Sequence, residues 1–405
     1  MMTQTKEPLR VMVLTTVAQT FAAFFEKQVR NLAEDGFEMH AVCSPGPALD
    51  RLNIGASVTR HGIEMQRQPR PWQDAKSLWN LLRLMRKVRP HIVHAHTPKA
   101  GLLGMLAAKL AGVPVRLYTI HGLPLETRTG LLRFILEWAE RASTACSTRT
   151  YAISRSLRNS VVELGLCPEW KVSMLGDGSC SGVDLDRFQA ADRNTQRAAI
   201  RNANQIPAYA TVATYIGRLS RDKGIEVLAQ AWPEIARLVP DLHLVIAGEL
   251  DTTDPVPMSA IQSLQNDPRI HFLGTVPAAQ IPSLYAAADL TVLPTFREGL
   301  SQVALESGAM AVPIVSTRVC GLVDSVVDGV TGILVPARDA AALAKAIAMV
   351  ATDASLRLRL GSAAKDYIVN HFSEKRVNQL WMAEYRRLVE ESFPEVRETA
   401  MQVRN

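Results

Sequence analysis

At 405 residues the chain is longer than one ordinary hydrophobic core supports, so we expect two domains of about 200 residues each. Hydrophobic residues make up 47% of the sequence, yet every long apolar run is interrupted before the ~18 residues that a membrane span requires. Five scattered cysteines without metal-ligand spacing argue against a disulfide framework and favour a reducing, cytoplasmic setting. The polar start "MMTQTKEPLR" argues against a signal peptide.

The net charge of +6 is unevenly distributed along the chain. Residues 1–190 carry 24 Lys and Arg against 16 Asp and Glu, whereas the remainder carries 21 against 23. A basic first half is expected to face an anionic partner. Its basic residues alternate with aliphatic ones, as in "LLRLMRKVRP", and no nucleic-acid-binding motif occurs, so anionic lipid headgroups or a pyrophosphate fit better than nucleic acid. A solvated basic surface without a partner is the alternative.

Short β-rich runs alternate with helical patterns from the start of the chain, which is typical of parallel sheets built from βαβ units. The strands expected in the first half are "LRVMVLTT", "FEMHAVCS", "HIVHAHT", "VRLYTIHG" and "RTYAIS". The helices expected between them are 21–35, 74–89, 99–111 and 128–144. We therefore predict a doubly wound, Rossmann-like α/β domain over residues 1–190.

After a polar, strand-poor segment the same pattern restarts. The strands expected there are "YATVATYIGRL", "LHLVIAGEL", "IHFLGTV", "LTVLPT", "VPIVST" and "TGILVP", which form a second doubly wound domain over residues 191–370. Ligands of such sheets bind beyond the carboxyl ends of the strands, so we expect the site in the cleft between the two domains. Residues 371–405 predict a C-terminal helix that packs back on the first domain, because its apolar residues share one stripe: Val377, Leu380, Trp381, Tyr385 and Leu388.

The segment "FREGLSQVALES" places Glu298 and Glu306 eight residues apart. Glu298 follows the apolar run "LTVLP" and precedes Gly299, so it is expected in the loop between a strand and a helix that begins near Ser301. Glu306 then lies in the second turn of that helix. The two carboxylates could hold hydroxyl groups of a ligand at the helix N-terminus, or they could simply be solvated.

A second candidate is the segment "YIGRLSRDKGIEVL". It ends a strand at Gly217 and then supplies Arg218 and Lys223 before a helix that begins near Gly224. Two cations and a helix N-terminus together suit a diphosphate. An exposed basic turn without a ligand is the alternative.

Histidines mark two more strand ends. "TIHG" ends a strand with His121, where an imidazole could donate a hydrogen bond to a phosphate or sugar oxygen. "VHAHTPKAG" places His94, His96 and Lys99 at another, where Zn²⁺ would lack a nearby third ligand. A loop histidine without special function is the alternative for each.

Taken together, these motifs resemble one known family. The order "TIHG", "SGVDLDRF", "GRLSRDKG", "IAGEL", "FLGTV", "REGLSQVALES", "PIVST" and "VVDGVTGILVP" is similar to glycosyltransferase family 4 over essentially the whole chain. The segments "VHAHTPKAGLLGMLAAKLAGVPVRLYTIHGLP" and "REGL" resemble the branch that builds capsular polysaccharide and exopolysaccharide on a lipid diphosphate. This resemblance implies the two-domain GT-B architecture.

The resemblance also implies roles for individual residues. Arg218 and Lys223 would neutralise the donor diphosphate, and Glu306 would bind the ribose hydroxyls. Glu298 would approach the donor sugar, and His121 would contact the donor near the reacting bond. The backbone amides that would face the sugar and phosphate belong to Gly299, Leu300 and Ser301.

The activity implied is that of a retaining, metal-independent glycosyltransferase. It would move a hexose or N-acetylhexosamine from a nucleotide diphosphate sugar, most simply a UDP-sugar, to a lipid-diphosphate-linked sugar at the inner face of the cytoplasmic membrane. We assign to the acceptor or membrane side His96, Lys99, Arg83, Arg86 and Lys87. No metal site or cofactor is expected. The alternatives are a sugar-nucleotide 2-epimerase of the same architecture and a non-catalytic nucleotide-sugar-binding component of a polysaccharide assembly.

Overall fold

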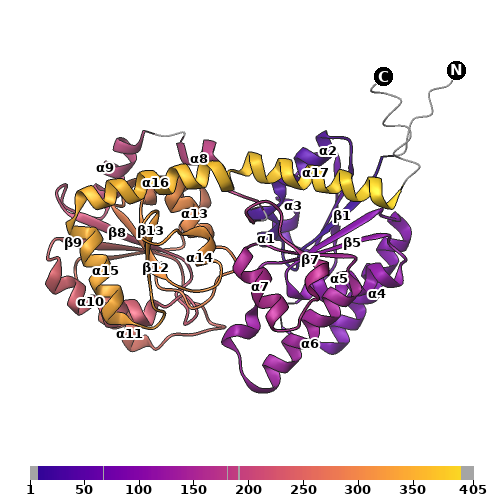
Figure 1. Cartoon of the computed structure of the whole chain (residues 1–405), viewed down its shortest axis with the longest axis horizontal. Helices are drawn as coiled ribbons and strands as arrows, with labels where there is room; N and C mark the ends of the chain where they lie inside the picture. The colour runs from indigo at the N-terminus through magenta and orange to yellow at the C-terminus, as the bar shows by residue number, and fades with distance from the viewer. Residues whose placement is uncertain (1–7, 67, 180, 190–191, 394–405) are drawn as a thin grey trace. The chain divides into compact units, whose positions relative to one another are not determined.

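The computed structural model describes residues 8–66, 68–179, 181–189 and 192–393. The chain divides into two compact units (Figure 1). Unit 1 comprises Met1–Ser181 together with Val377–Asn405, and unit 2 comprises Gly182–Arg376. The boundaries therefore lie at 181 and 376, whereas the sequence analysis placed them at 190 and 370. No helix of the described residues is long and apolar enough to cross a membrane.

Unit 1 is built on a seven-stranded sheet in which every neighbouring pair of strands is parallel. The strand order is β3-β2-β1-β4-β5-β6-β7, which reverses between β1 and β4, as in doubly wound folds. The strands are β1 (Arg10–Leu14), β2 (Glu38–Cys43), β3 (Val58–Gly62), β4 (Ile92–His96), β5 (Val115–Ile120), β6 (Arg149–Ala152) and β7 (Val172–Ser173).

Helices connect these strands and cover the sheet of unit 1 (Figure 1). The helix expected over 21–35 is instead two helices, because the backbone leaves helical geometry at Phe25. α4 packs against α5, and α5 packs against α6. The helices are α1 (Ala18–Phe24), α2 (Glu26–Glu34), α3 (Pro47–Asp50), α4 (Pro71–Val88), α5 (Pro98–Leu110), η1 (Pro124–Thr127), α6 (Gly130–Cys146), α7 (Arg155–Glu163) and η2 (Glu169–Lys171).

Unit 2 repeats this plan with a six-stranded parallel sheet in the order β10-β9-β8-β11-β12-β13. Its strands are β8 (Thr211–Ile216), β9 (Leu242–Ala247), β10 (Ile270–Gly274), β11 (Leu290–Leu293), β12 (Ile314–Thr317) and β13 (Gly332–Val335). Its helices are α8 (Leu185–Gln189), α9 (Arg193–Ala203), α10 (Ile225–Leu238), α11 (Met258–Gln265), η3 (Ala278–Gln280), α12 (Ile281–Ala287), α13 (Gln302–Ala309), α14 (Leu322–Ser325), α15 (Ala340–Thr352) and α16 (Ala354–Phe372).

The last helix, α17 (Glu374–Ser392), joins unit 1 from Val377 onward. Its apolar stripe is buried at Val377, Trp381, Tyr385 and Leu388. The Trp381 ring lies 5.0 Å from the ring of His94 on β4 and 5.1 Å from that of Tyr151 on β6, measured between centroids. Helix α17 thus completes the core of a unit whose other residues precede unit 2 in the sequence.

Candidate functional site

The turn after β8 is held in place by a close backbone approach. Gly224 has a φ of +71° and precedes α10, and a Cβ atom at this position would lie 1.8 Å from the carbonyl oxygen of Pro294. Only glycine accepts both that conformation and that contact without strain. The turn that carries Arg218 and Lys223 is therefore fixed against the loop after β11, which carries Glu298.

Lys223 and Glu298 meet at this junction. The Lys223 ammonium donates to the Glu298 carboxylate, with Nζ 2.6 Å from Oε1, and both side chains are largely buried. Two residues that the sequence places 75 positions apart are thus direct partners. Such partly buried, charge-assisted contacts are stronger than exposed ion pairs.

Asp222 organises the cations around this pair, and the sequence analysis missed it. Its carboxylate accepts hydrogen bonds from Ser220 and from Arg297, the latter at 3.0 Å, and lies 3.6 Å from the Arg218 guanidinium. Burial alone would raise the pKa of Asp222, but the Ser220 hydroxyl and the surrounding cations outweigh burial and lower it. The side chain of Arg218 is half exposed and also pairs with Asp251.

The loop after Glu298 leads into α13. Ser301 is its N-cap, and the Ser301 hydroxyl accepts a hydrogen bond from the backbone N–H of Ala304 at 3.3 Å. A Cβ atom on Gly321 would lie 2.5 Å from the carbonyl oxygen of Gly299, so a second glycine lets another loop pack against this segment. The helix begins where the sequence predicted, and the predicted amides of Gly299, Leu300 and Ser301 lie at its N-terminal end.

Glu306 lies in the second turn of α13, as predicted. The Tyr285 hydroxyl donates to its Oε2 at 3.3 Å, and the Gln302 amide donates to its Oε1 at 3.5 Å. Burial raises the pKa of Glu306 to about 7, although Arg187, Gln302 and Tyr285 act in the opposite direction. The carboxyl group is therefore poised to change its charge when it gains hydrogen-bond donors.

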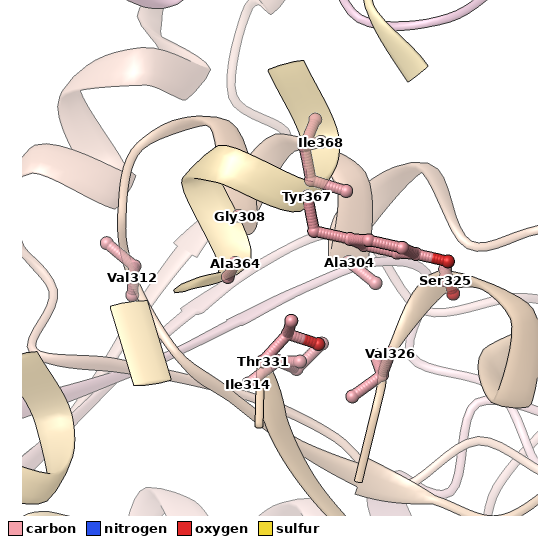
Figure 2. Close-up of a pocket in the computed structure, with 10 residues that line it drawn as sticks. All are labelled: Ala304, Gly308, Val312, Ile314, Ser325, Val326, Thr331, Ala364, Tyr367 and Ile368. Atoms are coloured by element: carbon pink, nitrogen blue, oxygen red, sulfur yellow. The ribbon is translucent and has the colours of Figure 1, made fainter. Parts of the chain in front are cut away.

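A small cavity lies behind α13, lined by residues from α13, β12, α14 and α16 (Figure 2). It has room for about one water molecule, which is far too small for a nucleotide. Gly308 lets α16 approach here, since a Cβ atom at this position would lie 2.7 Å from a side-chain carbon of Ile368. This cavity belongs to the packing that supports α13, and we assign it no ligand.

In unit 1 the three predicted histidines lie together, with His94 and His96 buried and His121 partly exposed. His96 Nδ1 lies 3.0 Å from His121 Nε2, and the His96 ring packs on Phe25 with 4.1 Å between centroids. His94 Nδ1 lies 2.5 Å from the Tyr385 hydroxyl, and its Nε2 lies 2.7 Å from the Thr119 hydroxyl. Burial lowers the pKa of His121 to about 4 and that of His94 to about 3, so both rings are neutral at physiological pH.

The remaining predicted residues of unit 1 lie on α4 and α5. Lys99 Nζ lies 2.6 Å from the Asp74 carboxylate, and the Lys99 side chain is only 10% exposed. Arg83, Arg86 and Lys87 are exposed on α4. Among the described residues, no group of three or more His, Cys, Asp or Glu side chains is placed to hold a metal ion.

Comparison with known proteins identifies the family. Residues 21–178 match the model described as "Glycosyl transferase 4-like domain", and residues 196–367 match "Glycosyl transferases group 1". The capsular polysaccharide biosynthesis glycosyltransferase CapM of Staphylococcus aureus is 31% identical over 383 residues, which cover 95% of this chain and 98% of CapM. The chain belongs to glycosyltransferase family 4.

Two further proteins are similar to this glycosyltransferase, one in sequence and one in fold. The UDP-Gal:alpha-D-GlcNAc-diphosphoundecaprenol alpha-1,3-galactosyltransferase of Escherichia coli is 27% identical, covering 86% of this chain and 89% of that enzyme. The solved structure of sucrose-phosphate synthase from Thermosynechococcus elongatus superposes with a TM-score of 0.79 at 19% identity, covering 95% of this chain and all of that one. This likeness agrees with the two parallel α/β domains and shows the GT-B fold.

The glycosyltransferase brings together in unit 2 Arg218, Lys223, Glu298 and the start of α13, whereas His121, His96 and Lys99 lie in unit 1. Sequence reasoning overlooked Asp222 and Arg297, although both stand directly beside predicted residues, in "RDKG" and "FREG". In the sequence Asp222 lies between two basic residues, which is typical of a solvated turn. Only the fold brings Arg297 into contact with it. Sequence reasoning also overlooked Tyr285 and Arg187, which act on Glu306 in the folded protein.

Proposed function

We propose that the chain is a retaining glycosyltransferase of surface-polysaccharide synthesis. It transfers a hexose or N-acetylhexosamine from a UDP-sugar to a lipid-diphosphate-linked sugar. Membership of the family supports glycosyl transfer, and the similarity to CapM supports the polysaccharide branch. The E. coli relative, which is named for a UDP-linked donor and a diphosphoundecaprenol-linked acceptor, supports this choice of substrates.

The observation that carries the proposal is the contact between Lys223 and Glu298 at the junction of two strand-end loops. Lys223 is a cation suited to a diphosphate, and Glu298 is a carboxylate suited to sugar hydroxyls. The two are in contact just before the N-terminus of α13. In a bound UDP-sugar the diphosphate and the sugar are likewise joined directly. Arg218 and the N-terminus of α10 supply further positive charge toward the diphosphate.

The chemistry assigned to these residues is stabilisation of the leaving group. As the bond between the sugar C1 and the diphosphate oxygen breaks, negative charge grows on that oxygen, and Arg218 and Lys223 stabilise it. The acceptor hydroxyl oxygen bonds to C1 on the same face of the sugar. Its proton passes to the leaving phosphate oxygen, so no separate protein base and no metal ion are required.

Glu306 is assigned to the ribose of the donor. A carboxylate with two oxygens can accept a hydrogen bond from each hydroxyl of a vicinal diol, and Gln302 and Tyr285 hold this one in place.

On the acceptor side, we propose that unit 1 works at the anionic inner face of the cytoplasmic membrane, where the basic residues Arg83, Arg86 and Lys87 of α4 would meet lipid headgroups.

The test is turnover of a panel of UDP-sugars with a lipid-diphosphate-linked sugar, with the anomeric configuration of the product read by NMR. We expect one UDP-sugar to be transferred with its configuration retained, and transfer to persist in EDTA. An inverted product would overturn the retaining mechanism. Loss of turnover in EDTA that Mn²⁺ restores would overturn metal independence. Release of a 2-epimer without acceptor would identify an epimerase, and UDP-sugar binding without any turnover would identify a binding component.

A further inference from the structure

Helix α6 of unit 1 has its apolar side in solvent. The residues that it buries are polar: Glu140, Ser143 and Thr144. The Tyr118 hydroxyl of β5 donates to Glu140 Oε2 at 2.8 Å, which anchors this polar side to the sheet. The opposite side carries large exposed apolar side chains, which we name the apolar face of α6: Leu131, Leu132, Phe134, Ile135 and Trp138. In most proteins such an apolar side is buried, and its burial holds the helix against the protein core.

The spacing of the apolar face makes it a continuous surface. Leu131, Phe134, Ile135 and Trp138 follow the i, i+3, i+4, i+7 pattern of a single helical stripe. Phe134 is 62% exposed and Trp138 is 61% exposed. Scattered apolar residues on a surface need no explanation, but a contiguous apolar stripe marks a binding surface.

The charge of helix α4, on the other side of α5, indicates what this surface binds. α4 and α6 flank α5, which packs against both (Figure 1). α4 exposes Trp72, which is 90% exposed, and Trp79, together with the basic residues Lys76, Arg83, Arg86 and Lys87. The acidic side chains of the two helices are engaged, Asp74 with Lys99, Glu137 with Arg133 and Glu140 with Tyr118.

This combination fits an anionic lipid surface. Exposed tryptophans and aliphatic residues beside a row of cations are the composition of surfaces that lie in the membrane interface, with apolar side chains below the headgroups and cations among them. A second copy of the chain fits less well, because a symmetric contact through this face would bring the cations of α4 toward those of the other copy. We propose that the apolar face of α6 inserts into the anionic bilayer, with α4 lying on the headgroups beside it.

The inference deepens the proposed function, since it names how the enzyme reaches a lipid-linked acceptor. It also separates two contributions to binding. Attraction between α4 and headgroups is screened by salt, whereas insertion of apolar side chains is not. Binding to anionic vesicles is therefore expected to weaken with salt and to reach a residual level that depends on the apolar face of α6.

The experiment uses the full chain and vesicles of phosphatidylcholine with or without phosphatidylglycerol. Phe134→Gln/Trp138→Gln removes the centre of the apolar face, and Met349→Gln/Leu358→Gln is the matched control, because those two residues are exposed apolar residues of unit 2. We expect the α6 variant to lose roughly tenfold or more in binding to phosphatidylglycerol vesicles, at low and at high salt. The control variant should bind as the parent protein does.

Separate readouts distinguish the inference from the proposed function. Both double variants should bind UDP as the parent does, and both should transfer sugar to a short-chain acceptor in detergent. Unchanged vesicle binding in the α6 variant, with transfer intact, would overturn the inference alone. Absence of transfer from every variant and from the parent would overturn the proposed function alone. A change from dimer to monomer in the α6 variant, measured by ultracentrifugation without vesicles, would show that a second copy covers the face and would overturn the inference.

Discussion

Lys223 and Glu298 form an ion pair, with 2.6 Å between Nζ and Oε1, in which the cation assigned to the diphosphate and the carboxylate assigned to the sugar hold each other. If the donor binds as we propose, it replaces or shares this contact. Under the proposed assignment, Glu298 competes with the diphosphate for Lys223, so we expect it to weaken UDP binding while it positions the sugar for transfer.

Substitutions at this pair are expected to have opposite effects on UDP affinity. Lys223→Met removes a charge-assisted contact of about 1.5–3 kcal/mol and should weaken UDP binding roughly 10- to 100-fold. Glu298→Gln frees Lys223 and should leave UDP affinity equal or higher, while kcat falls. Calorimetry with UDP and steady-state kinetics measure the two effects. An equal loss of UDP affinity in both variants would contradict the assignment.

Glu306 is expected to make the stability of the protein depend on pH. Burial raises its pKa to about 7 from an ordinary value of 4.5, so the folded protein holds this proton more tightly than the unfolded chain. The resulting stability is complete below about pH 4.5 and is lost as the pH rises through 7. Glu306→Gln carries no such proton. Its free energy of unfolding, relative to the parent, should rise by about 1–3 kcal/mol between pH 4.5 and 7.5 in urea titrations.

The same residue is expected to control donor affinity. If the ionised carboxylate accepts the ribose hydroxyls, affinity for a UDP-sugar should fall as the pH drops below about 7 and Glu306 becomes protonated. Glu306→Gln should bind roughly tenfold more weakly at pH 8 and show no such pH dependence. A UDP-sugar is the correct probe, because the terminal phosphate of UDP titrates in the same range. Unchanged affinity in the variant would remove Glu306 from the donor site.

His96 is expected to fix which nitrogen of His121 carries the proton. His96 Nε2 is buried without a hydrogen-bond partner, and a buried N–H without an acceptor costs more than a buried lone pair. His96 Nδ1–H therefore donates to His121 Nε2, which leaves the His121 proton on Nδ1. Nitrogen NMR should detect this tautomer, and a His121 proton found on Nε2 would contradict it.

The kinetic counterpart uses two substitutions of His96. Asparagine carries an N–H at the position of the histidine Nδ1, so His96→Asn should keep kcat close to that of the parent. His96→Leu removes the donor and should lower kcat roughly fivefold, the effect of one hydrogen bond of about 1 kcal/mol. A purely structural role for His96 predicts equal losses in both variants, accompanied by equal losses of thermal stability.

Gly224 is expected to be one of the least replaceable residues of unit 2. In Gly224→Ala the new Cβ would meet the Pro294 carbonyl oxygen at 1.8 Å and keep a φ of +71°, so we expect a loss of about 3 kcal/mol or more in the free energy of unfolding. Gly329→Ala is the matched control, with a φ of +75° and no atom within 4 Å, and should cost about 1 kcal/mol. Urea unfolding of both variants measures the difference, and equal costs would mean that the contact with Pro294 does not matter.

The alternation of strands and helices predicted both sheets, because buried parallel strands are continuous apolar runs. β3 was missed because it is an edge strand with the burial pattern of a mostly exposed segment, and β7 because it has only two residues. The single helix expected over 21–35 broke at Phe25, whose ring is packed against His96, a contact that only the fold creates.

For the candidate site, the sequence correctly predicted that Arg218, Lys223 and Glu298 lie in loops after strands, which is the edge where parallel sheets bind ligands. The pairing of Lys223 with Glu298 was beyond prediction, since it depends on two loops meeting at Gly224. The raised pKa of Glu306 could not be predicted from the sequence either, because it follows from burial beside Tyr285 and not from the residues that adjoin Glu306 in the chain.

The position of α17 has a consequence for how the chain folds during synthesis. Most of unit 1 is translated before unit 2, whereas Trp381 and Tyr385, which fill its core against His94, are translated after unit 2. Unit 2 is translated in full before they appear. The nascent first domain must therefore wait, with the side of β4 at His94 uncovered, until translation of the other domain ends. A premature stop near residue 376 would release a complete unit 2 joined to a unit 1 whose core is open.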